Sequence, residues 1–325
     1  MQLSPTWVAA DHLLRTSCCL CLWYIITFSA PYQDPDLHHM ISLLNMSCRV
    51  TSSRILQLSR AFTVSLKPPA QRRSLSSLPL AIKPSADEIA KATLSWKNLQ
   101  IATRALHRDG LVVLEDAIET PILDRLNSKM VADAEILRSA GENSPYNYNK
   151  GNLQQDPPLM KQLFSPSVYL NPLARQVVHS VLGPQSRLAF ISGNSAMPPT
   201  PESPPQSQPV HSDADFNHPD CPFALVVNIP LVDMTPENGS TEIWLGTHSL
   251  SNVNAQEGAH GERASGRINV NILEDRRRER PPSQPVVKKG SIILRDLRLW
   301  HAGKPNFSSD TRVMLALIHF AGWYQ

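Results

Sequence analysis

The chain is 325 residues long, with 42% hydrophobic residues, 18% charged residues and a formal net charge of +3. This length allows one large or two medium domains with a sizeable core. The small net charge, without a basic stripe interleaved with aromatic residues, argues against nucleic acid as a partner. The five cysteines are odd in number and four fall in the first fifty residues, which indicates no disulfide framework.

The first 84 residues differ in composition from the rest of the chain. Residues 16–33 carry no charge, but they are barely long enough to cross a bilayer. Residues 46–84 are rich in arginine and serine and lack Asp and Glu, as mitochondrial transit peptides do. We predict that residues 1–84 form a disordered leader or targeting segment outside the fold. We expect a cytoplasmic protein, with mitochondrial import as the alternative, and no stable membrane insertion of residues 85–325.

Residues 85–325 are predicted to form a single domain that begins with helices. The stretch from Ser85 to Glu88 has the spacing of a capping box, and apolar residues at helical spacing continue to Gly110. Residues 111–116 predict a strand. Residues 120–139 predict a second helix, and residues 171–183 predict a third, which ends at a glycine.

The second half of the domain changes to short strands separated by turn residues. We expect these strands at residues 187–191, 210–213, 224–231, 241–245, 291–295 and 312–320. Helices followed by many short strands predict an antiparallel barrel or sandwich with helices on one side. The long segment 249–285 has few apolar residues and predicts a lid over the mouth of the barrel.

Two separate stretches carry residues that can bind a metal. Residues i and i+2 of a strand point to the same face, so His211 and Asp213 of "VHSD" project together. His301 follows an apolar strand further along the chain. Two histidines and one carboxylate are typical of non-haem Fe(II) oxygenases and leave three metal positions open. Arg312, eleven residues after His301, can bind the carboxylate of a keto acid through two hydrogen bonds.

Other assignments stay open at this point. Asp215 is also at strand spacing from Asp213 and would replace it in a shifted register, although we favour a residue at the rim. His248 in "GTHS" is an alternative third ligand, although we favour a structural turn histidine. The same residues would also suit a non-catalytic, cupin-like small-molecule binder or a zinc-dependent hydrolase or isomerase. Arg312 favours the oxygenase.

The motifs "HSD" and "WHAGKPNFSSDTR", separated by "ENGSTEIWLGTHS", resemble the phytanoyl-CoA dioxygenase family of Fe(II)/2-oxoglutarate oxygenases. The resemblance covers roughly residues 105–320. It departs from the family at "KGS", where the strand before the distal histidine usually begins with Gly-Asp. Because that aspartate is not a ligand, the departure leaves the expected site intact.

The resemblance implies a mainly β fold with flanking helices, a double-stranded β-helix of the jelly-roll or cupin-like type. It implies iron bound by His211, Asp213 and His301, and the C5 carboxylate of 2-oxoglutarate bound by Arg312. Two further positions match residues that contact the co-substrate in some members, namely Thr241 and Gln208.

By the same resemblance the cofactors are Fe(II), 2-oxoglutarate and O2. The reaction is expected to oxidise a C–H bond of a small organic molecule, a secondary metabolite or an acyl-CoA-like compound. Hydroxylation is the expected outcome, with desaturation, epoxidation or ring formation as alternatives. The substrate and the oligomeric state, including a homodimer, are left open.

Overall fold

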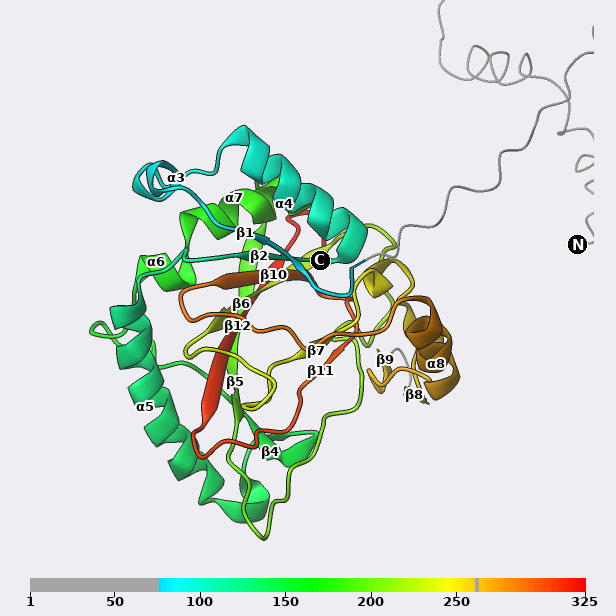
Figure 1. Ribbon diagram of the computed structural model, residues 1–325. Coiled ribbons are helices and arrows are strands. Elements are labelled where there is room, and N and C mark those ends of the chain that lie inside the picture. Colours follow the sequence, from blue (N-terminus) through cyan, green and yellow to red (C-terminus); the bar gives the residue numbers. More distant parts are fainter. Residues whose placement is uncertain (1–75, 261–262) are drawn as a thin grey trace, which may run out of the picture. The chain divides into compact units, whose positions relative to one another are not determined.

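The computed structural model of the chain describes residues 76–260 and 263–325 (Figure 1). Most of the expected leader lies outside these residues, and the location in the cell that depends on it stays a prediction. Within the described ranges, no helix is long and apolar enough to cross a membrane.

An eight-stranded main sheet forms the centre of the fold. Its strands lie in the order β1-β2-β10-β6-β12-β5-β4-β3, and all neighbours are antiparallel except β1 and β2. The bounds are β1 Leu80–Ile82, β2 Leu111–Leu114, β3 Tyr146–Asn147, β4 Asn149–Gln155, β5 Arg187–Ala196, β6 Ala224–Pro230, β10 Ile292–Asp296 and β12 Arg312–Phe320.

Strand β1 corrects the expected domain boundary at residue 84. Its three residues pair in parallel with β2, and Ile82 is buried in the hydrophobic core. The boundary predicted at residue 84 therefore lies too far along the sequence, because the first strand of the sheet comes before it. The signal was weak because three residues are too few to show an alternating pattern.

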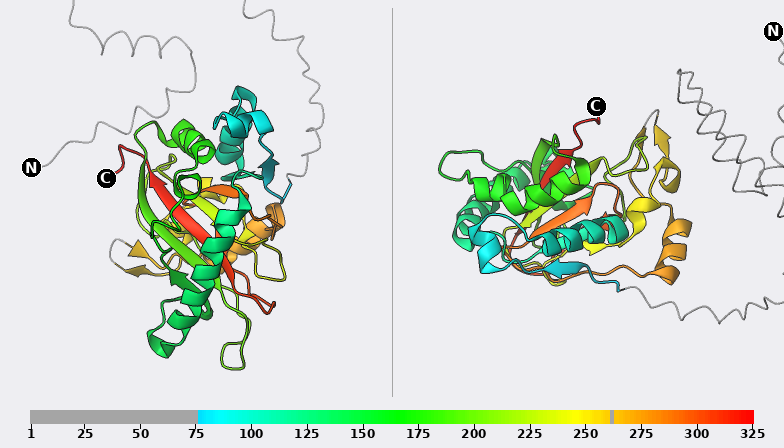
Figure 2. Two further views of the ribbon diagram at one scale, coloured as in Figure 1. Left: turned by 90° about the vertical axis from the view of Figure 1, so that its left-hand side faces the viewer. Right: turned by 90° about the horizontal axis from the view of Figure 1, so that it is seen from above.

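Helices cover one face of the main sheet. They are α3 (Ala86–Ala90), α4 (Trp96–Asp109), α5 (Thr120–Arg138), α6 (Pro166–Tyr169) and α7 (Pro172–Leu182). In the left view of Figure 2, α5 runs across the sheet. Strand β2 presents alternate residues to this layer: Val112 and Leu114 join the core against the helices, whereas Leu111 and Val113 lie in a separate cluster on the other face.

The expected single helix from residue 85 to 110 is two helices. Ser85 caps α3 with the predicted capping box, but the chain turns at residues 91–95 and Ser95 caps a new helix. Both N-termini share Glu88, whose carboxylate accepts hydrogen bonds from the backbone of Ser85 and Ser95. Apolar spacing did not reveal the break because it continues across the turn.

A smaller layer faces the other side of the main sheet. Strand β7 (Glu242–Ile243) pairs with β11 (His301–Ala302), and His211 forms bridges with His301 and Arg267. The expected strand 210–213 is thus reduced to isolated bridges at His211, and the expected strand 241–245 is shorter. The intervening chain forms η3 (Thr247–Ser249), η4 (Val253–Ala255), β8 (Ala259–His260), β9 (Arg263–Ala264) and α8 (Val270–Glu279). Two facing layers of strands with helices outside form the expected double-stranded β-helix.

Candidate active site

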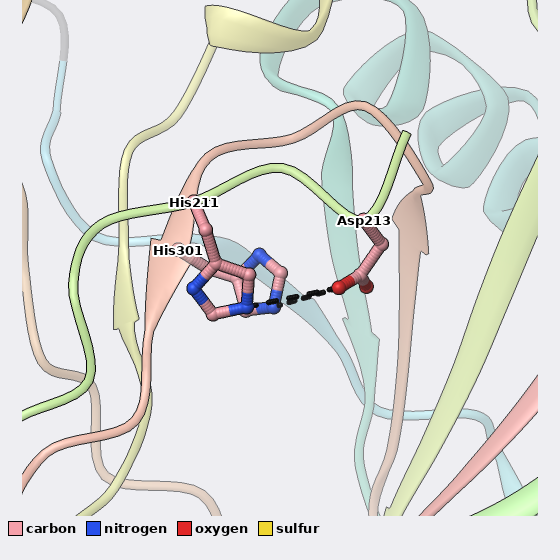
Figure 3. A group of neighbouring side chains, drawn as sticks. All are labelled: His211, Asp213 and His301. Atoms are coloured by element: carbon pink, nitrogen blue, oxygen red, sulfur yellow. Dashed lines mark ion pairs between the residues drawn. The ribbon is translucent and has the colours of Figure 1, made fainter. Parts of the chain in front are cut away.

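Three side chains of the smaller layer converge at one point (Figure 3). The Nε2 atoms of His211 and His301 each lie 3.7 Å from Oδ1 of Asp213. One potential ligand atom from each residue lies within 4.8 Å of the others, so the three could hold a metal ion. The bridge between His211 and His301 sets the two histidines side by side, with their ring centroids 4.3 Å apart.

Backbone carbonyls orient both imidazole rings. Nδ1 of His211 lies 2.8 Å from the Pro209 carbonyl, and Nδ1 of His301 lies 3.0 Å from the Leu299 carbonyl. A carbonyl oxygen can only accept, so each Nδ1 carries the hydrogen and each Nε2 carries the lone pair. Hydrogen bonds of this kind fix the tautomer and the direction of metal-binding histidines.

The environment favours neutral histidines beside an ionised carboxylate. Burial lowers the pKa of His211, and it lowers that of His301 further below the ordinary value. Burial acts to raise the pKa of Asp213, but the charge of Arg295 and its hydrogen bond outweigh burial, so the pKa is lowered. Two neutral nitrogens and one anionic oxygen are the donor set that suits Fe(II).

Arg295 is a residue of this site that the sequence did not reveal. Its Nη2 donates a hydrogen bond of 2.5 Å to Oδ2 of Asp213, and its Nε donates to Oδ1 of Asn228 at 3.1 Å. Its side chain is only 9% exposed. An arginine inside the apolar strand "SIILRD" is unusual enough to have drawn attention, because buried charges need partners.

Tyr148 also escaped the sequence argument. Its ring lies 4.7 Å from that of His211, and the guanidinium of Arg267 lies 6.0 Å from its centroid. Its backbone φ is +67°, a conformation that non-glycine residues adopt rarely. No local pattern in the sequence marks a tyrosine that reaches across to another layer.

A cavity of about 420 Å³ separates the two layers and contains the three converging side chains. Alternate residues of the main sheet form its floor, including Met314, Ala316 and Ile318 of β12. The register places Ile318 opposite Val226 of β6 and Phe190 of β5, which extends the apolar surface across three strands. Apolar side chains therefore make up much of the floor, with Arg295 and Arg312 as charged residues and Asn194 and Asn228 among the polar ones.

Arg312 lies in the same cavity, as predicted. Its side chain is buried, and Nη2 donates to the carbonyl of Gly239 at 2.7 Å. Among the described residues no group accepts a hydrogen bond from its Nε or Nη1. Burial lowers the pKa of Arg312 to about 10, so it remains charged at neutral pH. Gly239 has φ +77°, and a Cβ there would lie 2.4 Å from the Lys304 carbonyl.

Gln208 and Thr241 line the cavity as well. The Gln208 amide joins the two histidine segments, because its Oε1 accepts from the backbone N–H of Gly303 at 2.8 Å. Its Nε2 donates to the backbone carbonyl of Asn147 in β3 at 3.2 Å. A Cβ on Gly303 would lie 2.5 Å from Gln208 Oε1, so a larger residue there would displace the Gln208 side chain. The structure thus gives Gln208 a structural contact in addition to its place at the cavity wall.

The alternative ligands lie elsewhere. In the part of the chain that the structure describes, the potential metal group contains neither Asp215 nor His248. His248 is buried with its Nε2 3.2 Å from the carbonyl of His107, which fits the favoured structural role. The expected lid was wrong in its extent, because Pro285 is the one residue of segment 249–285 among the described cavity-lining residues. Arg276 of helix α8 donates a hydrogen bond to the carbonyl of Leu245, and Arg280, directly after the helix, donates one to Asp109.

Comparisons with known proteins agree with this geometry. One solved structure is that of the epimerase SnoN in complex with Fe3+, alpha ketoglutarate and nogalamycin RO. It matches with a TM-score of 0.53 and 16% identity, over 70% of this chain and 84% of that chain. Another structure of SnoN, described as a non-heme alpha ketoglutarate dependent epimerase, gives a TM-score of 0.50 at 16% identity, over 70% and 82%. At this identity the two likenesses support the fold.

The family comparison goes further, because residues 106–314 match the phytanoyl-CoA dioxygenase (PhyH) family. The match spans both histidine segments, the strands of the main sheet from β2 to β10 in chain order, and the first residues of β12. This family uses Fe(II), 2-oxoglutarate and O2. The chain therefore belongs to the phytanoyl-CoA dioxygenase family and is a non-haem iron, 2-oxoglutarate-dependent dioxygenase.

Proposed function

We propose that this dioxygenase oxidises, by hydroxylation as the default outcome, an unactivated C–H bond of a mainly apolar small molecule. His211, Asp213 and His301 hold the iron, and Arg312 holds 2-oxoglutarate. One observation carries the proposal: a potential metal group and a buried, incompletely paired arginine line the same cavity.

The three proposed ligands fit Fe(II) in number and in kind. Both histidines present a lone pair at Nε2, because Nδ1 is held by a carbonyl. Asp213 presents Oδ1, and its lowered pKa keeps it ionised. When bound, iron together with 2-oxoglutarate and O2 supplies the oxidising chemistry, while the protein supplies binding and orientation.

The guanidinium of Arg312 fits the distal carboxylate of 2-oxoglutarate. Nε and Nη1 each share one edge of the planar group with Nη2, which has a second N–H besides the one that bonds Gly239, so one edge can donate two parallel hydrogen bonds to a carboxylate. Leaving such donors unpaired in a buried site is unfavourable, so an anion that accepts from them gains binding energy. Thr241 and Gln208 lie at the wall of the same cavity and are proposed as weaker contacts of the co-substrate.

The cavity floor supports a substrate with an apolar body. Val226, Ala316 and Ile318 offer no polar side-chain groups, and burying apolar surface against them favours binding. Arg295 adds one donor, since within the described residues nothing accepts from its Nη1. We propose that the substrate carries an oxygen acceptor near the oxidised carbon. Secondary metabolites fit this description, as do acyl-CoA-like compounds whose acyl chain enters the cavity.

Succinate release tests the proposed function. The purified enzyme with Fe(II), 2-oxoglutarate and O2 is incubated with a panel of apolar small molecules that differ in their oxygen groups, and products are identified by mass spectrometry. The proposal predicts succinate in step with a product that gains one oxygen atom. SnoN is an epimerase, so a product of unchanged mass is also sought. Substrate-dependent succinate with only such a product would replace hydroxylation by another outcome.

A further inference from the structure

The Asp213 carboxylate is held differently at its two oxygens. Oδ1 faces Nε2 of both histidines at 3.7 Å. Oδ2 instead accepts a hydrogen bond of 2.5 Å from Nη2 of Arg295. One oxygen is thus directed to the metal site and the other to a buried cation. A carboxylate free of such a partner can bind a metal through one oxygen or through both.

Arg295 is itself fixed in place. It lies on β10, where the register pairs it with Val226 of the neighbouring strand β6. Its Nε donates to Asn228, and the Asn228 amide in turn donates to the carbonyl of Leu315 at 3.1 Å. This chain of hydrogen bonds spans three strands of the main sheet, so the guanidinium reaches Asp213 from a rigid surface rather than from a loop.

We propose that Arg295 restricts Asp213 to one coordinating oxygen and thereby keeps open the metal positions that 2-oxoglutarate and O2 require. This inference rests on the proposed metal centre. Three protein atoms leave three positions on an octahedral metal, and a keto acid occupies two of them. A second carboxylate oxygen would take the position left for O2 or compete with the keto acid. Arg295 is a positioning residue in this account, because it acts through Asp213.

The proposal predicts that removing Arg295 strengthens metal binding. A residue that merely supported the site would loosen the metal when removed, usually about 10–100-fold. Arg295 instead competes with the metal for the charge and the second oxygen of Asp213. Its removal should tighten metal binding about tenfold or more, because a cation bonded to a ligand opposes a divalent ion even in a protein interior.

Co(II) without co-substrate is the probe for the main experiment. Wild-type enzyme, Arg295→Gln, Arg295→Met and Arg295→Lys are titrated in competition with a chelator, and the visible absorption of bound Co(II) is recorded. The absorption weakens as the coordination number rises. We expect the Gln and Met variants to bind Co(II) more tightly, to absorb less, and to bind 2-oxoglutarate at least about tenfold more weakly. The Lys variant keeps the charge and should retain an affinity close to that of the wild type.

Two control variants separate the possible outcomes. Arg312→Gln removes another buried arginine of the same cavity, and it should weaken 2-oxoglutarate binding while leaving the Co(II) spectrum unchanged. His301→Ala should lose tight Co(II) binding, and wild-type affinity in that variant would overturn the metal centre itself. If the centre holds, equal or weaker Co(II) binding with an unchanged spectrum in Arg295→Gln overturns the role of Arg295. If the Gln and Met variants do not fold, the Lys variant decides, and a tenfold change in its affinity overturns the proposal.

Discussion

At the scale of single residues, Arg312 is a buried cation with only one of its nitrogens paired within the described chain. Replacing it by lysine keeps the charge but removes the planar pair of donors. Arg312→Lys should raise the KM for 2-oxoglutarate at least about tenfold while the protein stays folded. The measurement is succinate release at varied 2-oxoglutarate concentration. An unchanged KM would remove Arg312 from the co-substrate site.

Asp213 and Asp215 provide a matched pair for the metal centre. Asp213→Asn removes the anionic ligand but keeps the shape of the side chain, and it should abolish succinate formation and weaken metal binding at least about a hundredfold. Asp215→Asn should retain both, because Asp215 is outside the converging group. Equal losses of activity and metal binding in the two variants would contradict a specific role of Asp213 as the ligand.

The sequence could predict that His211, Asp213 and His301 lie together, but it could not predict their contact with Arg295. Strand spacing alone places His211 and Asp213 on one side, and the distal histidine and arginine lie in a motif of recognisable spacing. The contact between Arg295 and Asp213 joins residues of different layers. It depends on the register of β10 against β6 and on the distance between the layers. Neither of these can be recognised in a short stretch of sequence.

At the scale of secondary structure, apolar periodicity predicted the elements that bury one face. Helix α5 and strands β6 and β12 were found close to their actual bounds. Strand β4 was missed because its sequence "NKGNLQQ" is largely polar, and it is held by pairing with β5 rather than by an apolar face. Long-range pairing of this kind is not encoded in a short window.

Glu88 joins two helices and should make their stability depend on pH. Burial acts to raise its pKa, but hydrogen bonds from Ser85, Ser95 and Asn98 lower it from 4.5 to about 2. The folded pKa is depressed, so the ionised group stabilises the fold above pH 4.5, and this contribution is lost as the pH falls towards 2.

Glu88→Gln tests this assignment. The variant should lower the free energy of unfolding by about 1–2 kcal/mol at neutral pH. The difference from wild type should shrink as the pH is lowered to about 3, since below pH 4.5 the unfolded wild type takes up a proton at Glu88 that the folded protein does not. Urea denaturation of both proteins at several pH values measures it. A difference that does not depend on pH would mean that the charge of Glu88 is immaterial.

Strand β1 and the residues before it should be needed for a stable fold. Ser76 accepts two hydrogen bonds from Arg280, and Ile82 is buried. A chain that begins at Ser85 should lose about 3 kcal/mol or more of unfolding free energy relative to one that begins at Arg73. Denaturant unfolding of the two truncated proteins compares them. Equal stability would restore the boundary expected from the sequence.

At the scale of residues 76–325 as a whole, the fold brings distant segments to one cavity. His211 and His301 lie ninety residues apart in sequence but form one bridge, and the main sheet supplies Arg312 and Arg295 from the facing layer. The sequence predicted the two-layered fold through its family motifs. It did not predict that, of the described residues in segment 249–285, Pro285 alone would line the cavity.

An anaerobic crystal structure with Fe(II) and 2-oxoglutarate tests the central claim most directly. The account predicts iron bonded to Nε2 of His211, Nε2 of His301 and Oδ1 of Asp213 at about 2.0–2.2 Å, with the distal carboxylate of 2-oxoglutarate on Arg312. Iron bound by other residues, or a co-substrate carboxylate that does not contact Arg312, would contradict it.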